Sequence, residues 1–294
     1  MLDASIVIRT YNEAKRLPEL LGAIAELKLG SMSAEVILVD SGSTDETVTI
    51  GQRFGCRIVH ILKQEFTFGR SLNLGCEAAN ANLLVFISGH CVPVSGDWLV
   101  NLVAPIDAGE AAYTYGRQIG NNVTKFSEHQ IFRKFYPPTS LVPTSGFFCN
   151  NANAAISKEM WAAYGFDEGL TGLEDMDLAK RLVRDGYRVA YVAEAPIYHI
   201  HEESWGGLKL RYEREAIALQ RIMPEVHISA WDFLAFFCSA VFMDWKTAFR
   251  EGCLVSEAFG IVLFRFCQFW GTYSGNHDHR KLSQAMKKDY FYPR

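Results

Sequence analysis

Short β-branched runs alternate with helix-forming segments through the first third of the chain, and this alternation constrains the fold more than any other feature. Strands are predicted at residues 6–8, 36–39, 58–61 and 83–87, and helices at residues 17–27, 45–54 and 70–79. The strand candidates are continuously apolar, which is typical of strands buried on both faces. We therefore expect an α/β domain with a mostly parallel central sheet and helices on both faces.

The pattern becomes less regular after residue 87. A helix is predicted near residues 97–106, a strand near 111–118, an irregular stretch through Pro137, Pro138 and Pro143, a strand at 149–156, a helix at 173–185, two short strands at 189–192 and 197–200, and a helix at 208–223. A run rich in Trp, Phe and Cys then covers residues 231–270. We expect a catalytic-type domain over residues 1–204 and a helical region over residues 205–294.

Composition and charge exclude several classes of protein. The 294 residues carry a formal net charge of -4, whereas non-specific nucleic-acid binding needs an excess of Lys and Arg, so no nucleic-acid partner is expected. The seven cysteines include no Cys-x-x-Cys pair, and we expect them to be small buried apolar residues. The start of the chain lacks the basic and apolar regions of a secretory signal. The longest uncharged apolar stretch, Phe233 to Met243, is too short to span a bilayer. We expect a cytoplasmic protein without a membrane span.

Three polar loops follow predicted strands, at the carboxyl edge where open parallel sheets bind their ligands. They are Arg9-Thr10-Tyr11-Asn12-Glu13, Asp40-Ser41-Gly42-Ser43-Thr44-Asp45 and Ser88-Gly89-His90-Cys91. The loop that begins at Asp40 can bind a base or a ribose, and it can equally be an ordinary turn that caps the next helix. None of the loops has the glycine pattern of dinucleotide binders or of P-loops.

Two further groups of residues are candidates for chemistry. Glu174, Asp175 and Asp177 open a predicted helix, where carboxylates either cap the helix dipole or, at a cleft, take a proton from an acceptor hydroxyl. His199 and His201 are two residues apart on a predicted strand and so share one face. They are either structural or ligands of an ion or a phosphate.

Taken together, these segments resemble the family 2 glycosyltransferases, inverting enzymes of the GT-A fold. The resemblance extends over roughly residues 5 to 215 and depends on five motifs, which are Ile8-Arg9-Thr10-Tyr11-Asn12-Glu13, Val39-Asp40-Ser41-Gly42-Ser43-Thr44-Asp45, Phe68-Gly69-Arg70-Ser71-Leu72-Asn73-Leu74-Gly75, Glu174-Asp175-Met176-Asp177-Leu178 and Tyr198-His199-Ile200-His201. Within this family, the chain most resembles the rhamnosyltransferase-like members that build bacterial surface polysaccharides. The resemblance implies a GT-A nucleotide-sugar-binding fold, Rossmann-like in its central sheet.

The resemblance also implies roles for individual residues. Asp175 would be the catalytic base, while Glu174 and Asp177 would orient the helix and the acceptor. The remaining positions would bind the donor. Thr10, Asn12, Glu13 and Asp40 would contact the base and ribose, and Arg70 and Asn73 would lie near the base or the diphosphate.

One departure from the family pattern concerns the metal. Family members usually carry an Asp-x-Asp-like motif after the fourth strand, and this chain has Ser88-Gly89-His90 there. His90 could ligate Mn²⁺, together with His199 or His201, whereas Mg²⁺ prefers oxygen ligands. Alternatively, His90 faces the donor phosphate directly and no metal is needed.

The implied function is sugar transfer from a nucleotide-sugar donor to a hydroxyl group of a glycan or lipid-linked acceptor in bacterial surface polysaccharide biosynthesis. A non-catalytic sugar-nucleotide-binding protein and a sugar nucleotidyltransferase are the alternatives. The helical region after residue 205 is so apolar that we expect it to pack against another surface. The alternatives are the catalytic domain, a second copy in a homodimer, and a membrane surface. The last of these would place the protein peripherally on the inner face of the membrane.

Overall fold

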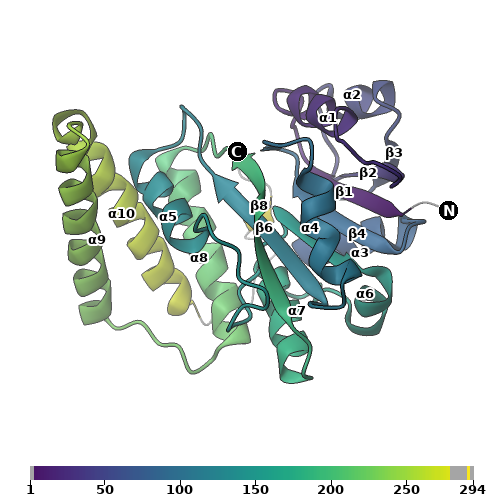
Figure 1. The fold of residues 1–294 in the computed structure, drawn as a ribbon. Helices are drawn as coiled ribbons and strands as arrows, with labels where there is room; N and C mark the ends of the chain where they lie inside the picture. Colours follow the sequence, from purple (N-terminus) through teal and green to yellow (C-terminus); the bar gives the residue numbers. More distant parts are fainter. Residues whose placement is uncertain (1–2, 279–289, 292–294) are drawn as a thin grey trace. The chain divides into compact units, whose positions relative to one another are not determined.

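The computed structural model describes residues 3–278 and 290–291 and has alternating strands and helices (Figure 1). The strands are β1 (Ala4–Thr10), β2 (Ala34–Asp40), β3 (Arg57–His60), β4 (Leu83–Ser88), β5 (Cys91–Pro93), β6 (Tyr113–Ile119), β7 (Asn153–Ser157) and β8 (Val189–His199). The helices are α1 (Leu17–Ala25), α2 (Thr47–Arg53), the 3₁₀ helix η1 (Lys63–Glu65), α3 (Phe68–Ala78), α4 (Trp98–Asp107), α5 (Phe126–Phe135), α6 (Lys158–Tyr164), α7 (Glu174–Arg184), α8 (Trp205–Ile222), α9 (Ala230–Arg250) and α10 (Leu254–Asn276).

The chain divides into two compact units. The first contains residues 1–121, 135–169 and 174–200, and the second contains residues 122–134, 170–173 and 201–294. The predicted boundary near Ser204, between a catalytic-type domain and a helical region, stays a prediction.

The whole sheet belongs to the first unit, in the strand order β3-β2-β1-β4-β7-β6-β8-β5. Four of the pairings are parallel: β1 with β2, β1 with β4, β2 with β3, and β6 with β8. Strand β7 lies between β4 and β6 and runs antiparallel to both. The predicted α/β class with a mostly parallel sheet is confirmed. Because β2, β1 and β4 are parallel neighbours, the loops that follow them leave the same edge of the sheet.

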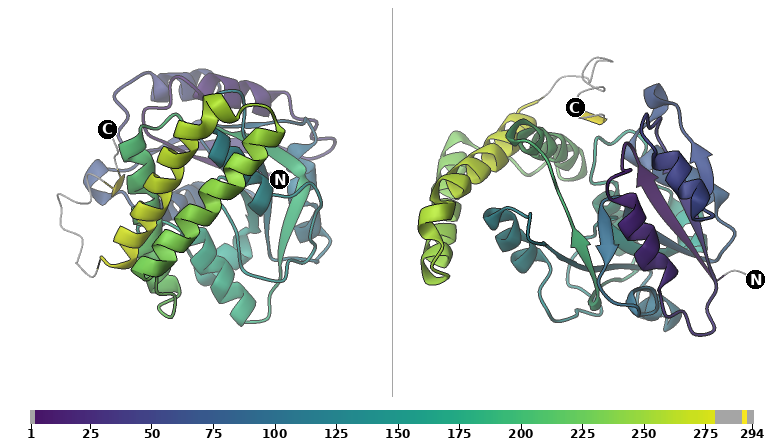
Figure 2. Two further views of the ribbon diagram at one scale, coloured as in Figure 1. Left: turned by 90° about the vertical axis from the view of Figure 1, so that its left-hand side faces the viewer. Right: turned by 90° about the horizontal axis from the view of Figure 1, so that it is seen from above.

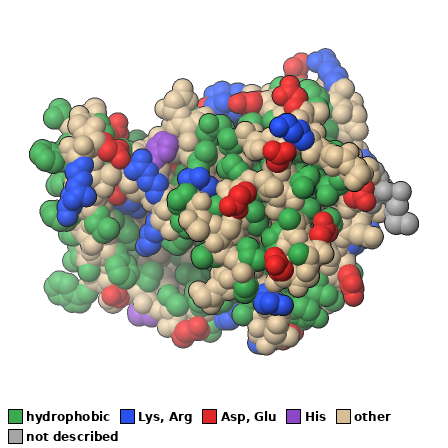
Figure 3. Space-filling view, in the orientation of Figure 1, with side chains coloured by type: hydrophobic (Ala, Val, Ile, Leu, Met, Phe, Trp, Pro, Cys, Tyr) green, Lys and Arg blue, Asp and Glu red, His purple; other side chains and the backbone are tan. Residues whose placement is uncertain are grey.

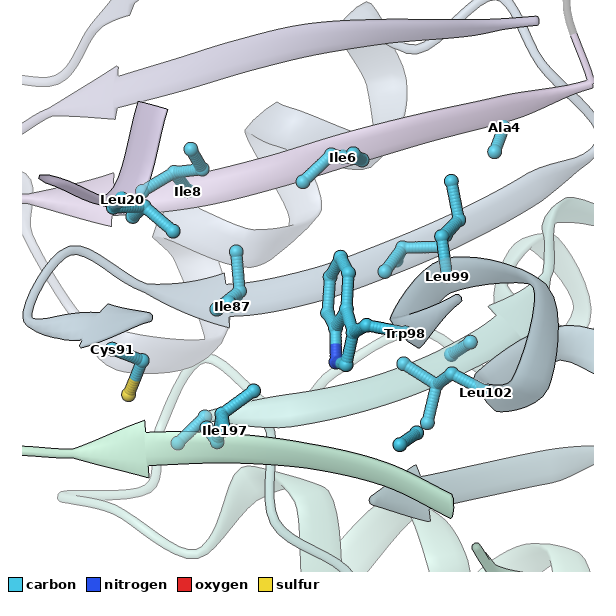
Figure 4. Packing of buried hydrophobic residues seen from close by; sticks show 14 of the residues in the cluster. Ala4, Ile6, Ile8, Leu20, Ile87, Cys91, Trp98, Leu99, Leu102 and Ile197 are labelled. Carbon is cyan, nitrogen blue, oxygen red and sulfur yellow. The ribbon is translucent and has the colours of Figure 1, made fainter. Parts of the chain in front are cut away.

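The core of this unit lies between one face of the sheet and helices α1, α2 and α4. Alternate residues of each strand share a face, and Figure 4 shows Ile6, Ile8 and Ile87 on the same side of the sheet as Trp98. Trp98 is fully buried, and its indole N–H donates to Asn153 Oδ1 over 2.9 Å. The polar end of this large side chain is thereby satisfied in the core.

Helix α3 covers the opposite face at close range. A Cβ atom at Gly75 would lie 2.4 Å from Cγ1 of Val7 and 3.0 Å from Cγ2 of Val39. Only glycine permits this approach of the helix to β1 and β2. The motif that contains Arg70 and Asn73 is thus held directly above the two strands that carry the polar loops.

The structure corrects three predictions on the later part of the chain. Helix α5 lies within the stretch that was expected to be irregular. The two short strands expected at 189–192 and 197–200 are one strand, β8, and the pairing with β6 shifts register between Gly116 and Gln118. This irregularity accommodates Pro196, which cannot donate a ladder hydrogen bond. Cys238 is exposed, although burial was expected for the cysteines.

The second unit is helical, and α9 and α10 run side by side in it (Figure 2). α10 also packs closely on α8, since a Cβ atom at Gly271 would lie 2.3 Å from the carbonyl oxygen of Lys209 and one at Gly275 2.1 Å from that of Glu213. Between α9 and α10, buried Arg265 forms two hydrogen bonds with buried Asp244, of 2.7 and 2.9 Å. This bidentate pair joins the two helices through their inner side.

Within the described part of the chain, one helix has the length and apolar composition of a membrane span, namely α10. Length and composition alone do not test the expectation of a chain without a membrane span, which stays a prediction. The expectation relied on uncharged stretches, whereas α10 includes Glu257 and Arg265.

Candidate active site

The carboxyl end of β2 forms a tight loop around the Asp40 carboxylate. Asp40 is buried, and its Oδ2 accepts hydrogen bonds from the N–H groups of Gly42 and Ser43, both of 3.0 Å, while the Ser43 hydroxyl donates to Oδ1. Gly42 has φ +88°, in the region that favours glycine. Asp40 therefore organises the backbone of its own loop, and its contact with the nucleotide stays a prediction.

The loop after β1 is fastened to this β2 loop. Asn12 Oδ1 accepts a hydrogen bond from the N–H of Thr44 (2.8 Å), and the N–H of Asn12 donates to Ser43 Oγ (2.9 Å). The N–H of Glu13 donates to Thr47 Oγ1 (2.8 Å). Asn12 has φ +56°, which asparagine tolerates better than most residues. The first two sequence motifs thus form one surface at the sheet edge.

A line of polar side chains runs from the loop after β1 to the end of β8 within the first unit. Glu13 Oε1 lies 3.0 Å from His90 Nδ1, His90 Nε2 lies 3.3 Å from His199 Nε2, and His199 Nδ1 lies 2.6 Å from Gln118 Oε1. Gly89 permits this approach, because a Cβ atom there would lie 2.9 Å from Cγ of Glu13. The Ser88-Gly89-His90 segment therefore holds its imidazole between Glu13 and His199.

The outer partners decide which nitrogen of each imidazole bears hydrogen. The Glu13 carboxylate only accepts, so Nδ1 of His90 donates to it. The Gln118 amide donates through Nε2 to Asn150 Oδ1 (3.0 Å), which turns its oxygen toward Nδ1 of His199. In the neutral rings both Nε2 atoms then carry lone pairs that face each other. A bound cation or a shared proton removes their repulsion.

His201 does not lie on the strand with His199, because β8 ends at His199. The expectation that both side chains share one strand face is therefore wrong. His201 belongs to the second unit, where Nδ1 lies 2.8 Å from Glu128 Oε1, and the same oxygen accepts a hydrogen bond from Arg211. A role for His201 as a metal ligand stays a prediction.

The first turn of α7 carries three carboxylates with different partners. Glu174 is buried and pairs with Arg9 of β1 (3.0 Å), and Asp177 pairs with Arg181 on its own helix (2.9 Å). Asp175 is buried and instead accepts hydrogen bonds from the backbone N–H groups of Asn151 and Met176, both of 2.8 Å. The Arg9–Glu174 pair connects this turn to the carboxyl end of β1.

Asp175 has the proton affinity of a group that works near neutral pH. Burial, followed by the negative charge of Glu174, raises the pKa of Asp175 from 3.8 to about 7. The two N–H donors and the guanidinium of Arg9 act in the opposite direction. A carboxyl group with a pKa near 7 can both accept and release a proton under ordinary conditions.

Arg70 and Asn73 face a different part of the same unit. The Asn73 amide donates to Glu168 Oε1 (2.9 Å) and to the carbonyl of Phe166 (3.0 Å), and its oxygen accepts from the indole of Trp161 and the N–H of Phe166. Arg70 lies 3.3 Å from Glu168. Both residues position the 158–168 segment, and their contact with the donor stays a prediction.

Three residues with clear roles in this geometry were not singled out from the sequence. They are Arg9, Gln118 and Asn151, which hold Glu174, His199 and Asp175 respectively. A signal was present for both, because Arg9 begins the first polar loop and Gln118 ends the strand predicted near 111–118. The N–H of Asn151 offers no such signal, since every residue other than proline has one.

The fold and the polar strand ends define a nucleotide-sugar glycosyltransferase of the GT-A class. The model of "Glycosyl transferase family 2" matches residues 5–164, and the chain belongs to this family. It is 28% identical over 214 residues to the O-antigen chain rhamnosyltransferase RfbN of Salmonella typhimurium, with 68% of this chain and 67% of the relative covered. It is 26% identical over 215 residues to the rhamnosyltransferase WbaN of Salmonella anatum, with the same coverage.

Solved structures support the fold. The mannosyltransferase PcManGT from Pyrobaculum calidifontis, in complex with GDP-Man and Mn²⁺, superposes with a TM-score of 0.62 at 16% identity and covers 98% of this chain and 87% of its own. Residues 1–349 of S. aureus TarS, in complex with UDP-GlcNAc, superpose with a TM-score of 0.53 at 14% identity, covering 95% of this chain and 93% of TarS. The predicted GT-A fold is confirmed.

Proposed function

We propose that the protein is an inverting glycosyltransferase that moves a sugar, of the deoxyhexose class in the first instance, onto a hydroxyl group of a glycan or lipid-linked acceptor in bacterial surface polysaccharide biosynthesis. The similarity to two O-antigen rhamnosyltransferases supports the sugar class and the acceptor class. The buried Asp175 carboxyl, with its raised pKa, carries the proposal, because it supplies the base that direct displacement requires.

In this reaction the acceptor oxygen attacks the anomeric carbon and Asp175 takes its proton. The bond between the anomeric carbon and the phosphate oxygen breaks, and the nucleotide leaves with the bonding electron pair, so configuration inverts. Backbone N–H groups of Asn151 and Met176 hold the Asp175 carboxylate in place while its remaining lone pairs stay available. Proton transfer to such a base contributes about 10²–10⁴-fold to the rate.

Arg9 makes Asp175 the base rather than Glu174. The guanidinium pairs with the Glu174 carboxylate at 3.0 Å and fixes it against β1. Asp177 is likewise paired with Arg181. Of the three carboxylates in this turn, Asp175 is the one held by backbone amides instead of an ion pair, and burial keeps its pKa raised.

The donor-binding part of the proposal concerns the loops after β1 and β2. Thr10, Asn12, Glu13 and Asp40 are brought together by hydrogen bonds between the two loops. Such a surface, at the carboxyl edge of a parallel sheet, is where nucleotides bind in open α/β folds. We assign it to the base and ribose of the donor.

His90 and His199 fit a divalent cation of the Mn²⁺ type. Ligating imidazoles usually donate their other N–H to a carboxylate or carbonyl oxygen, and Glu13 and Gln118 provide such acceptors. When bound, the ion would stabilise the negative charge on the departing phosphate. The structural relative PcManGT, whose complex contains GDP-Man and Mn²⁺, supports this assignment.

The reaction is tested with a panel of UDP-, GDP-, dTDP- and CMP-sugars, each assayed for transfer and for donor hydrolysis, with and without EDTA. The anomeric configuration of the product is read by proton NMR. We expect turnover of one donor with inverted configuration. Retained configuration would contradict the mechanism, binding without turnover would indicate a non-catalytic binder, and nucleotidyl transfer would indicate a nucleotidyltransferase.

The cation assignment is tested by binding of Mn²⁺ alone, followed through the electron paramagnetic resonance signal of the free ion. His90→Ala and His199→Ala should each weaken binding by about tenfold or more. His60→Ala, an exposed histidine of the same unit, is the matched control and should leave binding unchanged. Unchanged Mn²⁺ affinity in both variants would contradict the assignment and favour direct contact of His90 with the donor phosphate.

A further inference from the structure

Arg117, on strand β6, is a half-buried arginine without a partner of opposite charge. Within the described residues its guanidinium donates no hydrogen bond and forms no ion pair, and its Nε atom is buried without a partner. Every other half-buried arginine described in the first unit pairs with a carboxylate. These pairs are Arg9–Glu174, Arg16–Glu19, Arg70–Glu168 and Arg181–Asp177. An unpaired charge of this kind lowers stability, because it loses part of its hydration without compensation.

Arg117 lies near the carboxyl end of β6, at the edge of the sheet that carries the polar loops. Strand β7 is antiparallel to both β4 and β6, so β6 runs in the same direction as β4. The carbonyl oxygen of Arg117 accepts a hydrogen bond from the Asn153 amide (3.1 Å), and Asn153 is paired with Ile87, one residue before the end of β4. The next residue of β6, Gln118, holds His199. The backbone of Arg117 is therefore beside the proposed cation site.

The side chain of Arg117 lies on the face of the sheet that carries Asp175. Alternate residues of a strand share a face, so Tyr113, Tyr115 and Arg117 belong to the same one. The hydroxyl of Tyr113 donates to the side-chain oxygen of Asn151, and the backbone N–H of Asn151 holds Asp175. The proposed base and Arg117 thus approach the carboxyl edge from the same side.

Tyr191 of β8 establishes the direction of the Arg117 side chain, although β6 and β8 pair irregularly at this point. The rings of Tyr191 and Tyr115 are 5.1 Å apart between centroids. Burial raises the pKa of Tyr191 and the charge of Arg117 acts in the opposite direction, so the guanidinium is close to a neutral phenol that cannot compensate its charge. Glu194 also acts on Tyr191, but its carboxylate accepts from Ser140 and forms no ion pair with Arg117.

A guanidinium at this place fits a phosphate group. Its charge is permanent, and its planar set of N–H donors matches two phosphate oxygens at once. In the proposed displacement a phosphate leaves the anomeric carbon, and Arg117 lies on the face of the proposed base and beside the proposed cation site. We propose that Arg117 binds a phosphate of a substrate, either the nucleotide-sugar donor or a lipid-linked acceptor, a role that rests on the function proposed above.

The test is calorimetric binding of two kinds of phosphate probe to wild type, Arg117→Met and Arg117→Lys. The first kind is the set UDP, GDP, dTDP and CMP, each compared with its nucleoside, and the second is farnesyl diphosphate, compared with farnesol. Arg117→Met keeps an unbranched side chain without the charge, and it should weaken binding of the phosphate probe by about ten- to hundredfold while nucleoside binding is unchanged. Arg117→Lys should recover only part of the loss, because an ammonium lacks the guanidinium fork.

Farnesol is needed as a probe because the second unit exposes apolar side chains. Trp231, Phe249 and Val255 are among the exposed residues of α9 and α10, and Figure 3 shows hydrophobic side chains along the edge of the molecule formed by α9. A farnesyl chain can bind such side chains without any contribution from its phosphates. The difference between farnesyl diphosphate and farnesol therefore measures the contact with phosphate alone.

Thermal unfolding separates a ligand-binding arginine from a structural one. Without ligand, Arg117→Met should melt at the wild-type temperature or above it, because the substitution removes a charge that has no partner. The bound phosphate probe should raise the melting temperature of wild type more than that of the variant. Arg53→Met, at an exposed arginine of α2 in the same unit, is the matched control and should bind the probes like wild type.

Loss of affinity confined to a nucleotide would assign Arg117 to the donor, and loss confined to farnesyl diphosphate would assign it to the acceptor. Unchanged affinity of folded Arg117→Met for both kinds of probe would overturn the proposal, and so would wild-type protein that binds none of them. A lower melting temperature together with weaker nucleoside binding would assign Arg117 a structural role instead. Sugar transfer by wild type, measured with the donor panel, decides the proposed function separately, so the two can fail independently.

Discussion

Replacing Asp175 by asparagine should make the protein relatively more stable as the pH rises, because the substitution removes a carboxyl group whose ionisation opposes folding. Burial and the charge of Glu174 raise the pKa of Asp175 from 3.8 to about 7 in the folded protein. In the unfolded chain the carboxyl ionises near its ordinary pKa. Between these two values the unfolded state has lost a proton that the folded state keeps, so wild-type stability falls as the pH rises.

The size of the effect follows from the shift. Each pH unit in this window changes the free energy of unfolding by about 1.4 kcal/mol, so the full shift corresponds to about 4 kcal/mol and the part above pH 5 to about 3 kcal/mol. Above pH 7 both states are ionised and the effect levels off. Below pH 4 both states are protonated and the wild type loses nothing.

The asparagine amide also forfeits a hydrogen bond. The carboxylate accepts from the N–H groups of Asn151 and Met176, whereas the amide has one acceptor oxygen, which costs about 1–3 kcal/mol. This loss applies at every pH. Comparing the variant with wild type at pH 5 and at pH 8 therefore isolates the contribution of the proton.

The assay is denaturant unfolding of wild type and Asp175→Asn at both pH values. The difference in free energy of unfolding, variant minus wild type, should increase by about 3 kcal/mol from pH 5 to pH 8. Asp177→Asn, on the same turn but paired with Arg181, is the matched control. A difference for Asp175→Asn that is the same at both pH values would refute the reasoning.

Three further predictions concern the sheet, helices α9 and α10, and catalysis. Gly75→Ala should lower the free energy of unfolding by about 1–3 kcal/mol, because its Cβ would lie 2.4 Å from Val7. Gly22→Ala on α1, where a Cβ meets no atom within 4 Å, should instead raise the free energy of unfolding by up to about 1 kcal/mol. Equal melting temperatures for the two variants would contradict this prediction. Asp244→Ala leaves buried Arg265 without its carboxylate and should cost about 3–5 kcal/mol in thermal or denaturant unfolding, and a cost below about 1 kcal/mol would argue against the pair. The transfer rate should rise about tenfold per pH unit below pH 7 and then level off, since only the Asp175 carboxylate accepts a proton, and a flat pH profile would exclude Asp175 as the base.

The centre of the sheet was predictable because β1 and β4 are buried on both faces and are therefore continuously apolar over most of their length. The order of the strands was not, since the antiparallel insertion of β7 between β4 and β6 depends on packing of distant segments. Two strands were predicted on either side of Pro196. The structure has one long strand there, β8, and the irregular pairing of β8 with β6 accommodates the proline. Helix α5 was not predicted, because Pro137, Pro138 and Pro143 lie just after it and favour irregular structure.

The site was predictable as a set of residues but not as a set of contacts. The family resemblance selected Asp175 and the loops after β1 and β2. It did not reveal that Arg9 neutralises Glu174, which distinguishes the two adjacent carboxylates, nor that Gln118 orients His199. These pairings connect residues far apart in sequence, so they arise only from the tertiary structure.

The role of Asp175 as the base is tested most directly by the rate of sugar transfer at saturating donor, measured at pH 8 for wild type, Asp175→Asn and Asp177→Asn. We expect transfer by Asp175→Asn to fall by about 10²–10⁴-fold while the donor Kd stays within about twofold, and Asp177→Asn to retain most of its rate. Turnover by Asp175→Asn at the wild-type rate would contradict it.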